Sequence, residues 1–353
     1  MKLLNSFLSL MLLLAGATAT RAEAQDPQRE IIAVAPAASF STFRLEAKGG
    51  EVRVNTTTSD SIKVHVLLTI DGIREEEAIN RLERIGILDE VKGDRWEWKT
   101  DLDGMEIEYL TRLIDITYEI DLPGNIVMEI VQRNGDLTIG NRTAPVWLDV
   151  RWGNLSAGCL SGESNRIDLQ FAGADIACLG NAEVDLVAGK LSIAEVNDLS
   201  LRSKGAEVEV FHANAVDIQA HAGEYHFRKA ASISGTMTSS RLDVDTLTEE
   251  GDLDLSLMAG AEVGLSDLAQ RLKITADLAP VTVSYPKART VSLDLEARKD
   301  DLASIEVDGL PEAESLPDNK VRYHSDWAVA RSANPALQID IRSKRGRVKI
   351  IKE

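Results

Sequence analysis

The residues best suited to chemistry in this 353-residue sequence gather in one short stretch rich in histidine. Imidazole and carboxylate donors of the kind that bind zinc occur there together, at His212, His221, Glu224 and His226. Glu224 and His226 alternate with Tyr225 and Phe227, so a strand that buries the two rings turns both polar side chains outward. No spacing in this stretch matches a known metal motif, which favours an ordinary solvated face. We therefore expect no bound metal and no cofactor.

Carboxylate pairs form the second set that could do chemistry. They are Asp243 and Asp245, Glu249 and Glu250, Asp252 and Asp254, and Asp300 and Asp301. Glycoside cleavage needs two carboxyl groups roughly 5–10 Å apart in a cleft, a spacing that many exposed acid pairs meet by accident. Aromatic residues make up only 5% of the chain, and no G-x-S-x-G, H-E-x-x-H or phosphate-loop motif is found.

The sequence thus assigns no catalytic, cofactor-binding or metal-ligating residue, and we expect a protein that is not an enzyme. The outward residues of successive repeats look unrelated, whereas polysaccharide-active β-helix enzymes gather acidic, basic and aromatic residues in one outward stripe. A β-helix lyase or hydrolase acting on polysaccharide is nevertheless the alternative, because the fold expected below also carries such enzymes.

A short repeated phrase must position these side chains. Each copy has an apolar-x-apolar strand, a few small or polar residues, a glycine and a second alternating strand, as in MEIVQRNGDLTI and LDVRWGNLSA. The repeated glycines are Gly135, Gly153, Gly173, Gly189, Gly205, Gly223 and Gly260. A period near 18 residues with alternating strands inside it indicates a coil in which each repeat is one rung. We predict an all-β fold, a β-solenoid (β-helix-like) with rungs of about 18 residues and one short N-terminal amphipathic helix.

The chain divides into six segments around this repeat. They are a signal peptide at 1–24, a linker at 25–39, N-terminal strands and a helix leading into the solenoid at 40–127, β-solenoid rungs at 128–307, an irregular insert at 308–336 and a final strand pair at 337–353. Lys2, the short apolar run after it and the cleavage pattern Ala22-Glu23-Ala24 indicate the signal peptide. Apolar residues at helical spacing predict the helix at 73–90, which with the loop around Trp327 would cover the open ends of the core.

Two pairs of residues and the C-terminal tail leave alternatives open. Cys159 and Cys178 lie nineteen residues apart, about one rung, so they either form a disulfide or are two small buried residues. Trp96 and Trp98 share one strand face, where they either contact a sugar or protein or, as we expect, cover an edge of the core. The basic tail IRSKRGRVKIIKE either contacts an anionic polymer or an acidic neighbouring molecule or, as we expect, forms an exposed edge strand protected by lysine and arginine.

The net charge excludes one class of partner. The chain has 57 Asp and Glu residues against 39 Lys and Arg residues, a net charge of −18, which repels the phosphates of nucleic acid. Beyond the signal peptide, no run reaches the roughly 18 apolar residues of a transmembrane helix. We expect an exported protein, periplasmic or extracellular at the cell surface, whose partner is an envelope glycan or a surface protein. The oligomeric state stays open.

The segment ITYEIDLPGNIVMEIVQRNGDLTI at 116–139 resembles the bacterial exported "putative adhesin" domains of unknown function, β-solenoid relatives of the auto-transporter adhesin head domain. Pro123 and the phrases Asn134-Gly135-Asp136-Leu137 and Gly153-Asn154-Leu155 carry this resemblance, which extends over residues 40–350. The later repeats depart from it by losing the Gly-Asp or Gly-Asn signature. The resemblance implies a place in the cell envelope or outside the cell and a binding or structural role, and it supplies no catalytic residues.

Overall fold

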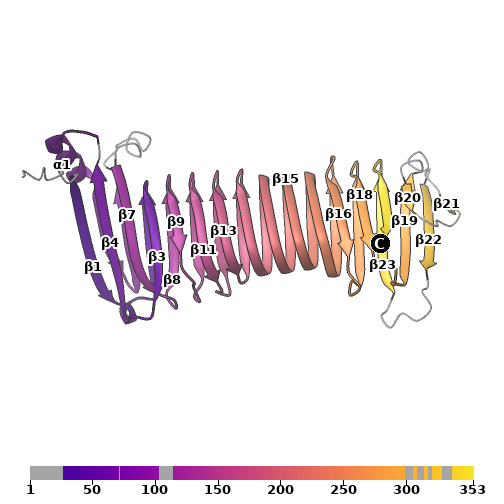
Figure 1. The fold of residues 1–353 in the computed structure, drawn as a ribbon, viewed down its shortest axis with the longest axis horizontal. Helices are drawn as coiled ribbons and strands as arrows, with labels where there is room; N and C mark the ends of the chain where they lie inside the picture. Colours follow the sequence, from indigo (N-terminus) through magenta and orange to yellow (C-terminus); the bar gives the residue numbers. More distant parts are fainter. Residues whose placement is uncertain are drawn as a thin grey trace, which may run out of the picture.

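The molecule is an elongated stack of strands that lie side by side along its long axis (Figure 1). The computed structural model describes residues 27–70, 72–102, 114–298, 305–307, 314–316, 320–327 and 336–353. The expected signal peptide at 1–24 lies outside these residues. The described chain is predominantly β, and pairing joins its strands into one continuous sheet.

Parallel pairing in register builds the middle of the stack. One row of strands is β8 (Val127–Arg133), β10 (Val146–Arg151), β12 (Asn165–Gln170), β14 (Ala182–Val187) and part of β15 (Lys190–Ser256). A second row is β9 (Asp136–Ile139), β11 (Asn154–Leu160), β13 (Gly173–Leu179) and an earlier part of β15. Met128 pairs with Val146 in the first row, and Leu137 pairs with Leu155 in the second. The repeated strand–glycine–strand phrase thus contributes one strand to each row.

Aliphatic columns that run along the long axis form the core. Side chains alternate between buried and exposed along each strand, as the period of two in the sequence predicts. Leu148, Ile167, Val184 and Leu201 lie in register on successive rungs, and each is at most 2% exposed. Burial of each such side chain is worth about 1.5–3 kcal/mol, so the columns hold neighbouring rungs together.

The corner between the two strands of a rung needs a left-handed residue and then a residue without a side chain. Asn134 and Trp152 occupy the left-handed position, with φ of 57° and 55°. The glycines that follow them are required for a different reason, because a Cβ on Gly153 would lie 1.9 Å from the carbonyl oxygen of Gly135. Of the seven repeated glycines, all within the described chain, Gly205 alone has a positive φ, at 64°.

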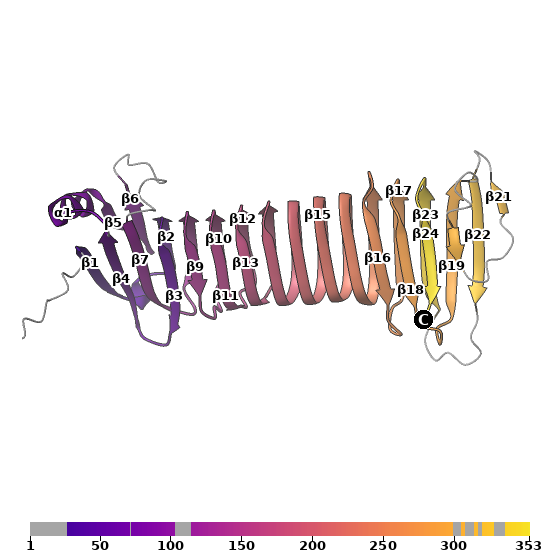
Figure 2. The same ribbon diagram turned by 45° about the horizontal axis from the view of Figure 1, so that its top comes forward.

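The N-terminal end contains a shorter helix than the sequence predicts. Helix α1 spans Glu75–Arg84, and residues 86–90 of the expected helix instead belong to strand β5 (Gly86–Lys92), antiparallel to β6 (Arg95–Asp101). Gly86 is a poor helix former, and pairing with β6 provides the hydrogen bonds that a longer helix would have made internally. Figure 2 shows α1 at this end of the stack, where its Ala78 and Leu82 are buried.

The expected linker at 25–39 is wrong, because strand β1 (Gln28–Pro36) occupies most of it. β1 runs antiparallel to β4 (Ser61–Ile70), and Arg29 donates from Nη1 to the carbonyl oxygens of Leu82 at 3.1 Å and Ile85 at 2.8 Å. These bonds supplement the hydrogen bond from the Ile85 N–H to the Leu82 carbonyl oxygen at the end of α1. The segment therefore both pairs with the sheet and caps the helix.

Two strands from early in the chain do not lie at the N-terminal edge of the stack, because each has a neighbouring strand on both sides. β2 (Thr42–Lys48) pairs with β6 on one side and β8 on the other, while β3 (Glu51–Thr57) lies between β7 (Ile114–Pro123) and β9. β4 then runs antiparallel to β7. The order of strands in space thus differs here from their order in the sequence.

The C-terminal end repeats this arrangement. Its strands are β16 (Gly260–Leu265), β17 (Arg271–Asp277), β18 (Val281–Tyr285), β19 (Val291–Arg298), β20 (Ile305–Val307), β21 (Glu314–Leu316), β22 (Lys320–Trp327), β23 (Leu337–Lys344) and β24 (Val348–Lys352). β23 lies between β17 and β19, and β24 lies between β18 and β20.

Two expectations for this end are therefore wrong. The basic tail is not an edge strand, because β23 and β24 each pair on both sides, and its arginines meet acidic neighbours, as in the 3.0 Å pair of Arg345 with Asp277. The segment 308–336 is not wholly irregular, because β21 and β22 lie within it and β22 pairs antiparallel with β19.

Candidate functional site

The structure confirms the alternation expected at the histidine-rich stretch but not the gathering of its donors. Tyr225 and Phe227 are buried, and His226 turns outward with its Nε2 3.0 Å from Oδ1 of Asp245. The donors that come within 4.8 Å of one another are those of His226, Asp243 and Asp245. This is a hydrogen-bonded, partly solvated group on two successive rungs.

The remaining histidines of that stretch lie elsewhere. His212 lines a separate hollow of about 530 Å³ with Glu195, Lys229 and residues near Cys178. His221 belongs to neither group. Side-chain donors come together only where they occupy matching positions on adjacent rungs. The sequence intervals between these histidines do not place His212 and His221 at positions that match His226.

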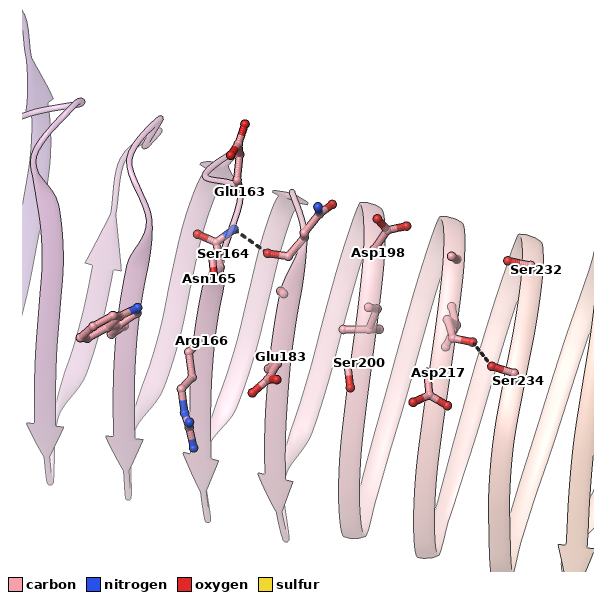
Figure 3. A pocket seen from close by; sticks show the side chains of 16 residues that line it. Glu163, Ser164, Asn165, Arg166, Glu183, Asp198, Ser200, Asp217, Ser232 and Ser234 are labelled. Atoms are coloured by element: carbon pink, nitrogen blue, oxygen red, sulfur yellow. Dashed lines mark hydrogen bonds between the residues drawn. The ribbon is translucent and has the colours of Figure 1, made fainter.

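A shallow groove crosses the outer face of the first row of strands (Figure 3). Its volume is about 580 Å³, and it continues over β10, β12, β14 and the following turns of β15. One column of lining residues takes a member from each of six successive rungs, namely Trp147, Arg166, Glu183, Ser200, Asp217 and Ser234. Trp147 is 50% exposed, so its ring is available at one end of the groove.

The polar groups of the groove are held at the corner by hydrogen bonds. Asn165 is buried and donates from Nδ2 to the carbonyl oxygens of Gly162 at 2.8 Å and Asn181 at 3.2 Å. The ionisable lining comprises four carboxylates against one guanidinium, namely Glu163, Glu183, Asp198 and Asp217 against Arg166. The groove therefore offers hydrogen-bond acceptors, hydroxyl groups and one aromatic ring within a negative field.

A ladder of aspartates runs beside this groove. Asp149, Asp168 and Asp185 lie in register on successive rungs. Burial raises the pKa of Asp168, Arg166 partly offsets that effect, and the neighbouring Asp185 adds to it. Arg202 donates to Asp185 at 2.7 Å. The stacked carboxylates are thus partly neutralised by neighbouring arginine side chains. The expectation that outward residues of successive rungs are unrelated is wrong on this face.

Two exposed aromatic rings meet at a rung corner, a pairing that the sequence does not predict. Trp152 and Phe171 stack with an interplanar angle of 3° and ring centroids 6.2 Å apart. They are 55% and 57% exposed, and both have positive φ. The signal in the sequence is the large aromatic residue in the corner position of two successive repeats.

Trp96 and Trp98, by contrast, are 4% and 2% exposed. Trp96 stacks on Phe40 with ring centroids 5.6 Å apart and meets Trp98 edge-on at 5.5 Å. The expectation that this pair covers the edge of the core is confirmed, and its use as a contact patch is excluded.

Cys159 and Cys178 form a disulfide between adjacent rungs. The two residues are paired in register in β11 and β13, with Cα atoms 4.4 Å apart. Of the two alternatives for these cysteines, a disulfide or two small buried residues, the structure therefore contains the disulfide. This bond links the second row of strands close to one end of the regular stack.

The sequence matches no protein-family model and no curated protein. Among solved structures it is similar to a "putative cell adhesion protein" from Clostridium sporogenes, with 14% identity over 92% of this chain and 100% of that chain and a TM-score of 0.23. It is also similar to a "putative adhesin" from Parabacteroides merdae and a "Putative lipid binding protein" from Parabacteroides distasonis, each with 8% identity over 92% of this chain and 96% of the other and a TM-score of 0.31. Similarity at this level assigns no function, and the family resemblance of the sequence stays a prediction. Within the described ranges, no helix has the length and apolarity needed to cross a bilayer.

Proposed function

We propose that the protein is an exported, non-enzymatic binding protein of the cell envelope or cell surface, adhesin-like in the broad sense and built on a β-solenoid scaffold. The observation that carries this proposal is the groove that crosses six successive rungs. A binding site of that shape fits an extended polymer better than a compact small molecule. Its affinity comes from many weak contacts repeated along the stack.

The side-chain columns favour a glycan over a peptide as that polymer. Backbone N–H and C=O groups of the parallel strands point along the stack, where they are already hydrogen-bonded to the neighbouring rungs. A peptide that binds by adding a strand needs a free strand edge, and the paired strands of these middle rungs offer none within the described residues. The groove instead presents hydroxyl, amide and carboxylate groups at the rung spacing of about 4.8 Å, which suits the repeated hydroxyl groups of a sugar chain.

A signal-peptide pattern and a disulfide support the proposal that the protein is exported. Residues 1–24 have the pattern of a signal peptide, and a disulfide such as Cys159–Cys178 persists in an oxidising compartment. The surplus of acidic residues keeps such a protein soluble in the periplasm or outside the cell. An envelope glycan or a glycosylated surface protein is the partner that this location supplies.

A binding screen with a parallel turnover assay tests the proposal. The chain from residue 25 to residue 353 is presented to neutral, amino-sugar and acidic envelope polysaccharides, and bound and cleaved fractions are both measured. We expect binding without cleavage, weakened by Trp147→Ala and unaffected by Glu207→Ala, which lies outside the groove. Absence of binding to every polymer would favour a structural spacer instead.

An enzyme acting on polysaccharide is the second candidate, and the aspartate ladder favours it. Burial raises the pKa of Asp168, the direction that favours a proton donor, and this residue lies one rung from Asp185 on the face that carries the groove. Cleavage of any polymer that Asp168→Asn abolishes would replace the binding proposal with this one.

A further inference from the structure

Trp152 and Phe171 stand in a backbone conformation that suits neither residue. Their φ angles are 55° and 52°, in the left-handed region where bulky L-residues crowd their own backbone. The same corner is left-handed on the neighbouring rungs, where Asn134, the residue type better suited to this region, lies on one side and Ala188 on the other. The fold imposes this conformation on many rungs, as at Ala222, Leu257 and Leu278, so these two positions are distinguished by the large exposed ring that each carries.

The residues next to the two rings are small and leave the rings accessible. Gly153 follows Trp152, and Ala172 and Gly173 follow Phe171, so the chain beyond each ring carries almost no side chain. Polar groups lie on the other side, where Arg151 donates from Nε to Asp149 at 3.2 Å. The corner therefore combines apolar ring surface with a charged pair that can donate and accept hydrogen bonds.

The small area of the two rings limits the kind of ligand that they can bind. The aromatic surface spans two rungs only, since Asn134 and Ala188 end it on either side. A stable protein partner needs about 800 Å² on each side, far more than two rings supply. One or two sugar rings fit the patch, because their apolar faces stack on aromatic rings while their hydroxyl groups bond to paired acidic and basic side chains.

We propose that Trp152 and Phe171 form a stacking platform for a saccharide ring, a second contact site separate from the groove. Trp147 of the groove lies near the start of β10 and Trp152 directly follows its end, so about five residues of strand, roughly 16 Å, separate the two. The platform rests on the proposed function in that its ligand is a glycan. It adds a contact at the opposite end of the strands.

Binding of short neutral oligosaccharides, built from hexose and from N-acetylated amino sugar, tests this assignment. Intrinsic tryptophan fluorescence and calorimetry are measured for the chain 25–353, for Trp152→Asn and Phe171→Asn, for the groove variant Trp147→Asn and for the control Leu257→Asn. Asparagine suits the left-handed corner, as Asn134 shows, so the first two variants remove the rings and keep the fold. Each should weaken binding of a disaccharide about tenfold, whereas Leu257→Asn, at an exposed left-handed corner of a distant rung, should leave it unchanged.

Unchanged disaccharide affinity in both corner variants would overturn the platform. If Trp147→Asn alone weakened binding, the groove would remain and the platform would be wrong. If no saccharide bound the wild-type chain at any length, the platform and the proposed function would fail together. Binding to phospholipid vesicles that Trp152→Asn abolishes, without saccharide binding, would reassign the corner to a membrane surface.

Discussion

Gly153 lies directly over Gly135, so close that a Cβ on Gly153 would approach the carbonyl oxygen of Gly135 to 1.9 Å. The same contact joins Gly135 to Gly50, where the distance would again be 1.9 Å. Backbones at these corners therefore approach each other as closely as the strands themselves allow. This contact, rather than backbone freedom, explains why the repeated phrase contains glycine.

Gly153→Ala should accordingly destabilise the protein strongly. Its Cβ meets backbone atoms that cannot rotate away, so we expect the free energy of unfolding to fall by about 3 kcal/mol. Gly205→Ala is the matched comparison, since Gly205 has φ of 64° and nothing lies within 4 Å of the position that its new methyl group would take. That variant should lose only about 1–2 kcal/mol. Chemical denaturation of both measures the difference, and equal losses would contradict the close-approach explanation.

The sequence predicts this corner only in part. Glycine spacing and strand alternation define the rung, because they reflect local backbone contacts that recur with every repeat. They do not reveal that Trp152 takes the left-handed conformation, since tryptophan avoids it and only the neighbouring rungs impose it. The position of the tail is likewise hidden. β23 and β24 pair only with strands more than forty residues away among the described residues, and acidic partners such as Asp277 for Arg345 become apparent only after that pairing.

The candidate surfaces are predicted less well than the fold. The columns Trp147–Arg166–Glu183 and Asp149–Asp168–Asp185 depend on which residues align across rungs of unequal length. Steps of 19 and 17 residues both occur there, so an average period places side chains one or two positions wrong. A shift by one residue moves a side chain to the opposite face of the strand.

Replacing the strained tryptophan should make the protein more stable. Trp152→Asn relieves a left-handed conformation that costs a bulky residue roughly 1 kcal/mol, and it exposes little new core because the ring is already 55% exposed. We expect the free energy of unfolding to rise by about 1 kcal/mol. Trp147→Asn has no such strain to relieve and should not gain stability. A loss of stability in Trp152→Asn would show that the ring is held for packing.

Removal of the disulfide should destabilise the native state. The bond closes a loop with a sequence separation of 19, for which chain entropy gives about 3 kcal/mol. Urea denaturation of Cys159→Ala/Cys178→Ala should therefore show a lower free energy of unfolding. Reductant should destabilise the wild-type chain by a similar amount and leave the double variant unchanged. If reductant had no effect on the wild-type chain, the bond would be absent in solution.

Alkaline pH should weaken the fold through Tyr118. Burial raises the pKa of this phenol to about 12, from 10.0 in the unfolded chain, and Thr100 lies 2.7 Å from its hydroxyl. Because the folded pKa is the higher one, the stabilisation is complete below pH 10 and is lost as the pH rises towards 12. We expect a loss of about 2–3 kcal/mol across that window, relative to Tyr118→Phe. Parallel pH dependences in the two proteins would contradict the buried phenol.

Calorimetric titration of the chain 25–353 with one glycan series of increasing length tests whether the groove binds an extended sugar polymer. The groove crosses six successive rungs at a spacing of about 4.8 Å, so each added sugar ring should gain contacts until the chain spans the groove. We expect an affinity that rises with length over about six rings, then levels off, with no product released from the longest chain. Affinity that is independent of length beyond a disaccharide, or cleavage of the polymer, would contradict it.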